Sequence, residues 1–438
     1  MVVFAHGIVG RADLPIPEAM FGAAAAAVLV ISFLALATLW SEPRLEHLRE
    51  RRLFRLPLAG DVVLGTLGVL VLLLTAYAGL AGTDNQRENI APWMVYVALW
   101  VGIPVASLAL GDIWRLISPW RAIGRAAGWA LSRVGGDEPP EPLPYPARLG
   151  RWPAAAGVVG FGICELCWGT AQEPAPLAAL MLIYVVAMLV GMSLYGVEQW
   201  TRNADAFGVY FGMFGALAPL ARRAGVLYAR LPFVGAVREI DGRVAGTAAV
   251  LLAGIGVTAF DGAAEGPLFN DLLPHLQDFF GDLGFGPQRA LELGFTTGLL
   301  AAVALVSLIW IVARPGPRLA HSLAPILAAY VVAHYFSLLA YNGQDIARLA
   351  SDPLGDGSDI FGTADSAIDY GVVSATAIWY VQVGALVVGH VAALMLAHDR
   401  ALVIYGSHRE ATRSQIVMLI LMVCFTCLGL WLLSVANA

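Results

Sequence analysis

The feature that most limits how this chain folds is its supply of long apolar stretches. About ten windows of roughly 20 residues carry few charged side chains, and a helix of that length crosses a bilayer. They lie near residues 19–40, 62–81, 92–111, 152–171, 176–196, 244–261, 290–312, 319–341, 375–397 and 415–435. Their alanine, leucine and valine runs show no period of two, which argues against a β-barrel. The sequence therefore predicts an all-α, polytopic transmembrane bundle of about ten spans, with residues 1–438 forming one integral membrane domain.

The amino-acid composition excludes several classes of protein and of mechanism. The 438 residues are 59% hydrophobic and 13% charged, with a mean hydropathy of +0.73, which excludes a soluble enzyme and a disordered tail. All 26 basic residues are arginine, so mechanisms that need a lysine nucleophile or a P-loop lysine are excluded. The net charge is −6 and no basic tract is present. The expected partner is the lipid bilayer rather than nucleic acid.

The arginines predict the orientation of the chain. With the N-terminus outside, the inner segments 41–61, 112–151, 197–243, 313–318 and 398–414 contain 22 of the 26 arginines. The outer side keeps Arg11, Arg87, Arg289 and Arg348. Positively charged loops stay in the cytoplasm, so both termini are expected outside, in a multi-pass protein of the bacterial inner membrane. A strong arginine cluster follows the first span, as in a retained helix rather than a cleaved signal peptide.

Four connecting segments are long enough to have structure of their own. In 112–151, tryptophans alternate with arginines, which predicts an amphipathic helix in the headgroup layer before a proline-rich linker. The apolar stretch within 197–243 is short, so we expect it to be interfacial or re-entrant. The outer segment 261–289 predicts one short amphipathic helix, and the outer loop 342–374, rich in Asp and Gly, predicts mostly turns.

Ionisable side chains within the predicted spans are the candidates for chemistry, because they are costly in lipid unless paired or hydrated. Glu165 and His334 lie at similar depth in the outer half, together with Gln382. A further set lies just above this layer or on the same side: Asp261, Glu292, Asp369, His6 and Asp13. One interpretation is an outer-half pocket in which His6, Glu165 and His334 bind a divalent metal ion with an open water position. The other is that Glu165 and His334 only hydrogen-bond neighbouring helices.

A second polar layer lies nearer the inner side. His390 is within the ninth predicted span, and His398 and Asp399 are at its inner end. His390 and His398 are eight residues apart, on roughly one side of a helix. They would continue a proton or ion path from the outer layer, or they would be a packed core histidine and an interfacial ion pair.

The four cysteines form two equal spacings, Cys164–Cys167 and Cys424–Cys427, both inside predicted spans. At i and i+3 of a helix the geometry suits a disulfide poorly. Four thiols on two touching helices would bind a soft ion, but small buried hydrophobic residues are the simpler interpretation. No G-x-S-x-G elbow and no nucleotide-binding motif is present, which argues against a serine hydrolase and a kinase.

Several stretches resemble one family of polytopic bacterial membrane proteins, frequent in actinobacteria, known as fenitrothion hydrolases. The similar stretches are AHGIVGRADLPIPEAMFG, IWRLISPWRAIGR, ADAFGVYFGMFGALAPL, HYFSLLAYNGQD, SDPLGDGSDIFGTAD and IWYVQVGALVVGHVAALMLAHDRAL. The last is the most specific. The resemblance implies hydrolysis of an organophosphate triester at its aryl ester bond, together with a related membrane subunit. The polar positions inside these stretches are His6, Asp13, His334, Gln344, Asp345, Gln382, His390 and His398.

Three functions follow as expectations. The first is a metal-assisted integral membrane hydrolase in which Glu165, His334 and Asp345 are catalytic. The second is a transporter or channel, favoured by polar groups at two depths. The third is a non-catalytic subunit of a larger membrane complex, favoured by the acidic outer loops.

Overall fold

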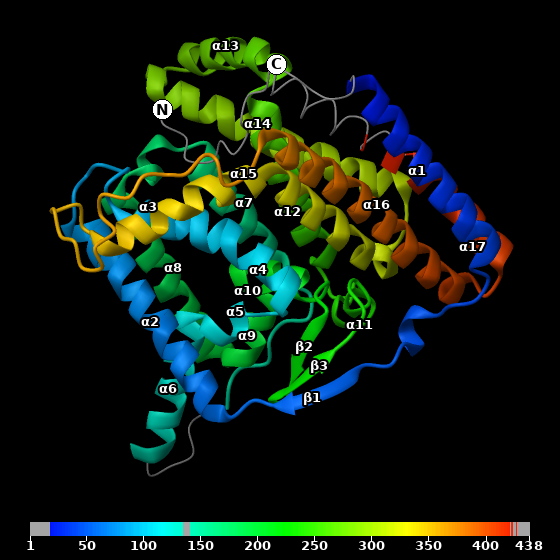
Figure 1. Cartoon of the computed structure of the whole chain (residues 1–438), viewed down its shortest axis with the longest axis horizontal. Helices are drawn as coiled ribbons and strands as arrows, with labels where there is room; N and C mark the ends of the chain where they lie inside the picture. Colours follow the sequence, from blue (N-terminus) through cyan, green and yellow to red (C-terminus); the bar gives the residue numbers. More distant parts are fainter. Residues whose placement is uncertain (1–17, 135–140, 421, 424–425, 427–438) are drawn as a thin grey trace.

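The computed structural model describes residues 18–134, 141–420, 422, 423 and 426 of the chain. Most of these residues are helical, and a small sheet lies at one end. Figure 1 shows this sheet, formed by β1, β2 and β3, at the opposite end of the molecule from helix α13, with the long helices between them. We call these ends the sheet side and the α13 side. The strands belong to arginine-rich segments, so the sheet side is the one that the sequence predicts to be cytoplasmic.

Seven helical stretches in the described residues are long and apolar enough to cross a membrane. They are α2 (Leu58–Ala81), α3 to α4 (Ile90–Leu110), α8 (Pro174–Tyr195), α12 (Thr247–Ala264), α14 (Pro287–Ala313), η4 with α15 (Pro317–Ser351) and α16 (Ala375–Tyr405). These correspond to seven of the ten predicted spans, so a multi-pass membrane protein is confirmed.

The other three predicted spans differ. Helix α1 (Glu18–Leu39) has a shorter apolar helical part, Ala23–Leu39, and α7 (Trp152–Leu166) is also short for a span. Most of 415–435 lies outside the described residues. The span count of ten and the position of both termini therefore stay predictions.

Several predicted boundaries are corrected by the structure. Helix α7 ends at Leu166, and the short 3-10 helix η3 (Gly169–Gln172) follows where the span was expected to continue. Helix α15 (Leu323–Ser351) continues well past 341, so the first part of the loop 342–374 is helical rather than turns. Helix α16 likewise runs to Tyr405 rather than 397.

The third span contains a wide helical segment. Helix α3 (Ile90–Pro92) leads into a π-helix, η2 (Trp93–Gly102), before α4 (Ile103–Leu110). The backbone N–H of Ile103 bonds to the carbonyl of Ala98, five residues earlier. Pro104 is the second residue of α4, and a proline ring clashes with the carbonyl four residues before it in an α-helix. The wider π register accommodates this proline and turns Tyr96 and Trp100 into the bundle.

The sheet side holds strands that the all-α prediction did not include. The sheet order is β1 (Arg51–Arg55), β3 (Val226–Ala229), β2 (Leu220–Arg223), and both pairs are antiparallel. Ala224 and Gly225 connect β2 to β3 with positive φ angles of 49° and 77°, the backbone that a tight two-residue hairpin requires. Strand β1 comes from the distant segment 41–61. Its pairing with β3 is therefore a tertiary contact that no local sequence pattern predicts.

The remaining helices are shorter than the seven spans. They are η1 (Leu45–His47), α5 (Trp114–Ile117), α6 (Pro119–Val134), α9 (Val197–Asn203), α10 (Ala206–Gly215), α11 (Gly235–Glu239), α13 (Pro267–Asp282) and α17 (His408–Ser414). The amphipathic helices expected in 112–151 and 261–289 correspond to α6 and α13. The apolar helix α10 is short and almost entirely buried.

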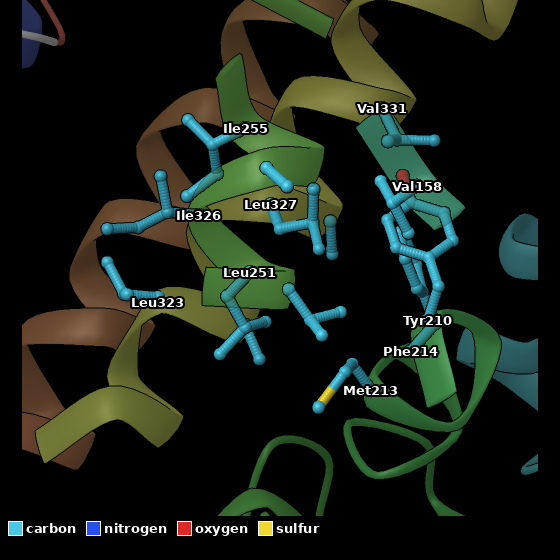
Figure 2. Close-up of a cluster of buried hydrophobic side chains, with 14 of the residues drawn as sticks. Val158, Tyr210, Met213, Phe214, Leu251, Ile255, Leu323, Ile326, Leu327 and Val331 are labelled. Atoms are coloured by element: carbon cyan, nitrogen blue, oxygen red, sulfur yellow. The ribbon is translucent and has the colours of Figure 1, made fainter. Parts of the chain in front are cut away.

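Helices α12 and α15 form the centre of the molecule, because two thirds of their apolar windows are buried against 6% for α14. Figure 2 shows part of the core that they share with α7 and α10, including Tyr210, Leu251 and Leu327. The absence of a side chain at Gly254 of α12 permits this packing. A Cβ there would lie 2.6 Å from the Tyr210 ring and 2.9 Å from Leu327.

Candidate functional site

The two central helices meet at a buried carboxylate, Asp261 of α12. One of its oxygens, Oδ2, accepts hydrogen bonds from His334 Nε2 at 2.8 Å and from the Tyr335 hydroxyl at 2.7 Å. All three residues are buried, with Asp261 only 2% exposed. A buried carboxylate is tolerated when donors surround it, and α15 supplies two consecutive donors here.

Glu165 lies in the same region, near the end of α7. It is 3% exposed, and its Oε2 has no hydrogen-bond partner among the described residues. Asp261 is one of the ionisable groups that interact with it electrostatically, and Gln172 donates to its backbone carbonyl at 2.9 Å. We call Glu165, Asp261, His334 and Tyr335 the Asp261 cluster. It combines two carboxyl groups, an imidazole and a phenol inside an apolar bundle.

Aromatic side chains from the π-helical segment, α7 and α10 lie in the region of Glu165. Both Tyr96 and Tyr210 interact with it electrostatically. Trp100 stacks on Tyr210 with ring centroids 4.9 Å apart and contacts Phe161 at 4.4 Å. The Tyr96 hydroxyl donates to the carbonyl of Ala171 at 2.7 Å, which fixes its ring. A low-dielectric surrounding of this kind strengthens every electrostatic interaction within it.

The structure brings together some of the predicted residues and separates others. Glu165 and His334 share the Asp261 cluster, as the layer prediction expects. Asp345 lies 11 residues further along α15, about 16 Å away at 1.5 Å per residue, and pairs with Arg348 at 2.9 Å. Gln382 is buried on α16. His6 and Asp13 lie outside the described residues.

Of the residues predicted just above the layer, Glu292 is buried and pairs with Arg289 at 2.9 Å. Asp369 belongs to the loop between α15 and α16, where its backbone N–H donates to the Gln344 side chain.

The residues of the second predicted layer lie within hydrogen-bond distance of backbone and side-chain groups. His390 is buried and its Nδ1 lies 2.7 Å from the carbonyl of Leu386 on its own helix. His398 Nε2 lies 2.9 Å from the carbonyl of Trp40. Asp399, fully buried, accepts from the Trp40 indole at 3.0 Å and from the backbone N–H groups of Arg44 and Leu45. The C-terminal part of α16 therefore anchors the chain that follows α1.

The predicted metal site is only partly within the described residues. Within the described ranges, no group of three or more His, Cys, Asp or Glu side chains is arranged to hold a metal ion. The site with His6, Glu165 and His334 stays a prediction, because His6 lies outside these ranges. Elemental analysis of the purified chain tests it directly. Cys164 and Cys167 are free thiols, and Cys424 and Cys427 lie outside the described residues.

Sequence reasoning named Asp261 but did not give it a central role. The predicted span stopped at this residue because apolar windows end at the first charge. In the structure α12 continues to Ala264, so Asp261 lies one turn inside the helix. One sequence signal could have predicted this contact. A lone carboxylate at the end of one span and a His-Tyr pair within another span both require hydrogen-bond partners, and each can supply them to the other.

The site rests on this geometry alone, because the chain matches no protein-family model, no curated protein and no solved structure.

Proposed function

We propose that the protein is an integral membrane hydrolase that uses the Asp261 cluster to activate water against lipophilic esters. The observation that carries the proposal is the 2.8 Å hydrogen bond between His334 Nε2 and Asp261 Oδ2. A carboxylate that accepts from one ring nitrogen fixes the tautomer and leaves the other nitrogen with a lone pair. His334 Nδ1 is then the base that takes a proton from water.

Gly262 supports this role for Nδ1, because it leaves space beside that edge of the imidazole. A Cβ on Gly262 would lie 3.6 Å from both Nδ1 and Cε1 of His334. Gly262 is itself partly exposed, whereas Asp261 beside it is buried. A water molecule therefore has its approach to the ring on the glycine side.

The proposed reaction is attack of water on the phosphorus of an aryl phosphotriester. The water oxygen forms a bond to phosphorus while His334 Nδ1 takes the water proton. The bond between phosphorus and the aryloxy oxygen breaks, and its electron pair leaves with that oxygen. Glu165 gives a proton to the departing aryloxide and regains one from the imidazolium through solvent. General acid and base groups of this kind contribute roughly 100- to 10,000-fold each.

The substrate class follows from the surroundings. The cluster lies within an apolar bundle and beside the Tyr96, Trp100 and Tyr210 rings, so a neutral aromatic ester that partitions into the bilayer suits it. An aryl phosphotriester is the class that the family resemblance implies.

The test uses the purified chain in detergent with 4-nitrophenyl diethyl phosphate as the probe, measured by release of 4-nitrophenolate. We expect turnover that falls at least 100-fold in His334→Gln. Gly262→Val, which would cover Nδ1, should lose activity while keeping the melting temperature close to that of the parent. The control is Gly160→Val on α7, where a Cβ meets nothing within 4 Å. No turnover by the parent protein, or full activity in His334→Gln, contradicts the proposal.

A second candidate, a proton-coupled transporter, is favoured by one observation. Glu165 and Asp261 are two buried carboxyl groups that interact electrostatically, and carboxyl groups within membrane-spanning helices mark the proton pathways of transporters. Substrate uptake into proteoliposomes driven by a proton gradient, lost in Glu165→Gln, would replace the hydrolase proposal if ester hydrolysis is absent.

A further inference from the structure

Strand β1 and the two residues before it form an exposed, arginine-rich edge on the sheet side. All five residues of β1 are exposed, and so is Arg49. We call Arg49, Arg51, Arg52 and Arg55 the β1 arginines. Across the part of the chain that the structure describes, none of the four has an ion-pair partner, although Glu50 lies among them and pairs elsewhere.

The neighbouring arginines of the sheet side behave differently. Arg222 of β2 pairs with Asp61 at 2.6 Å, and Arg223 pairs with Glu50 and Glu239 at 2.5 and 2.8 Å. Buried Arg230 also pairs with Glu239, at 2.5 Å. Carboxylates are therefore within reach of this region, and they bind to the arginines of β2 and its surroundings. The β1 arginines keep an uncompensated positive charge.

Apolar side chains accompany these charges. Leu53 is 41% exposed and Phe54 is 56% exposed, both on β1. The membrane-spanning helix α2 begins at Leu58, only three residues after the strand, and Leu58 is 68% exposed. The strand therefore lies where a span enters the bilayer, with cations and apolar groups next to each other. This is the composition of an element that rests at the headgroup layer.

We propose that the β1 arginines bind the phosphate groups of anionic phospholipids in the leaflet on the sheet side, while Phe54, the more exposed of the two apolar side chains of β1, inserts toward the acyl chains. Charge complementarity carries this assignment. An arginine guanidinium binds phosphate with two parallel N–H donors, and the unpaired β1 arginines have these donors free. Each arginine near an anionic surface strengthens binding about fivefold. The surface is independent of the Asp261 cluster.

The experiment measures binding of fluorescent phosphatidylglycerol to the purified, delipidated chain in neutral detergent, with fluorescent phosphatidylcholine as the neutral lipid. We expect the parent protein to prefer phosphatidylglycerol, and the triple variant Arg51→Gln/Arg52→Gln/Arg55→Gln to bind it about 100-fold more weakly. The preference should also fall as salt rises, because exposed charges are screened. Binding of phosphatidylcholine should not change.

The matched control removes the same charge from the same side through Arg115→Gln/Arg223→Gln/Arg243→Gln. Each of these arginines is exposed but paired with a carboxylate. We expect this variant to keep most of its phosphatidylglycerol affinity. Equal losses in both triple variants would mean that net charge alone attracts the lipid, and would overturn the proposal. An unchanged affinity in the Arg51→Gln/Arg52→Gln/Arg55→Gln variant would overturn it as well. Single substitutions of Arg51, Arg52 and Arg55 give the same answer if the triple variant fails to fold.

Discussion

His334 and Tyr335 are consecutive residues of α15, yet both donate a hydrogen bond to the same oxygen of Asp261. Neighbouring residues on a helix point about 100° apart, so their side chains converge only on an atom that lies between them. The two rings are nearly perpendicular, at 84°, with centroids 4.6 Å apart. Asp261 therefore fixes the direction of both side chains at once, and α12 and α15 are held in one register.

The first prediction separates the two donors. Tyr335→Phe keeps the ring and removes one hydrogen bond to Asp261, so we expect it to lower the free energy of unfolding by about 1 kcal/mol. Asp261→Leu leaves the Nε2 of His334 without its acceptor. We expect it to lower the free energy of unfolding by roughly 1–3 kcal/mol more than Tyr335→Phe does. Thermal unfolding in detergent measures both. A larger loss from Tyr335→Phe than from Asp261→Leu would show that the carboxylate is not the shared anchor.

The second prediction concerns Glu165, because its buried Oε2 has no hydrogen-bond partner within the described ranges of the chain. Replacing a poorly satisfied buried polar group by an apolar group of similar shape is close to neutral or stabilising. We expect Glu165→Met to keep or raise the melting temperature and to abolish hydrolysis of the phosphotriester probe. A clear fall in stability would instead assign Glu165 a structural role.

The helical bundle can be predicted from the sequence because the length of an apolar stretch is a local property of the chain. Seven of the spans could be located this way, and so could the helices α6 and α13, whose apolar and polar residues alternate with a helical period. The same logic predicts Glu165 and His334 as candidate site residues, since a titratable group at membrane depth is costly unless it is paired or hydrated.

The sequence alone does not show which distant residues contact each other. Asp261 pairs with residues 73 and 74 positions away, and no spacing rule connects them. Strand β1 pairs with β3 across 171 to 178 positions of the chain, so no local pattern predicts the sheet. The helical continuation of α15 past 341 depends on contacts such as Arg348 with Asp345 and with the carbonyl of Arg87, which hold a polar segment in helical form.

The third prediction concerns the close contact between α15 and α16. A Cβ on Gly389 would lie 2.4 Å from the Cβ of Ala329 and 2.6 Å from the carbonyl of Pro325. Gly389→Ala must therefore push the helices apart, and we expect a loss of about 1–3 kcal/mol. Gly384→Ala is the control on the same helix, because a Cβ there meets nothing within 4 Å. It should be neutral or stabilising by up to ~1 kcal/mol. Equal melting temperatures for the two variants would contradict the close packing.

The fourth prediction is a pH dependence at the sheet side. Burial raises the pKa of the Glu50 carboxyl, but the hydrogen bond and charge of Arg223 and the charges of Arg238 and Arg230 outweigh it and lower this pKa below the ordinary 4.5. A carboxyl whose pKa falls on folding stabilises the folded state above its unfolded pKa, and this contribution disappears as pH falls through the folded value.

Glu50→Gln should therefore melt below the parent protein at pH 7, and the difference should shrink as the pH is lowered through 4.5 and beyond. Glu42→Gln serves as the control, because Glu42 is exposed and has no ion pair within the described part of the chain. Melting curves in detergent from pH 7 down to the acid limit of solubility measure the effect. A difference between Glu50→Gln and the parent that stays constant over this range would mean that Arg223 and Arg238 do not act on the Glu50 charge.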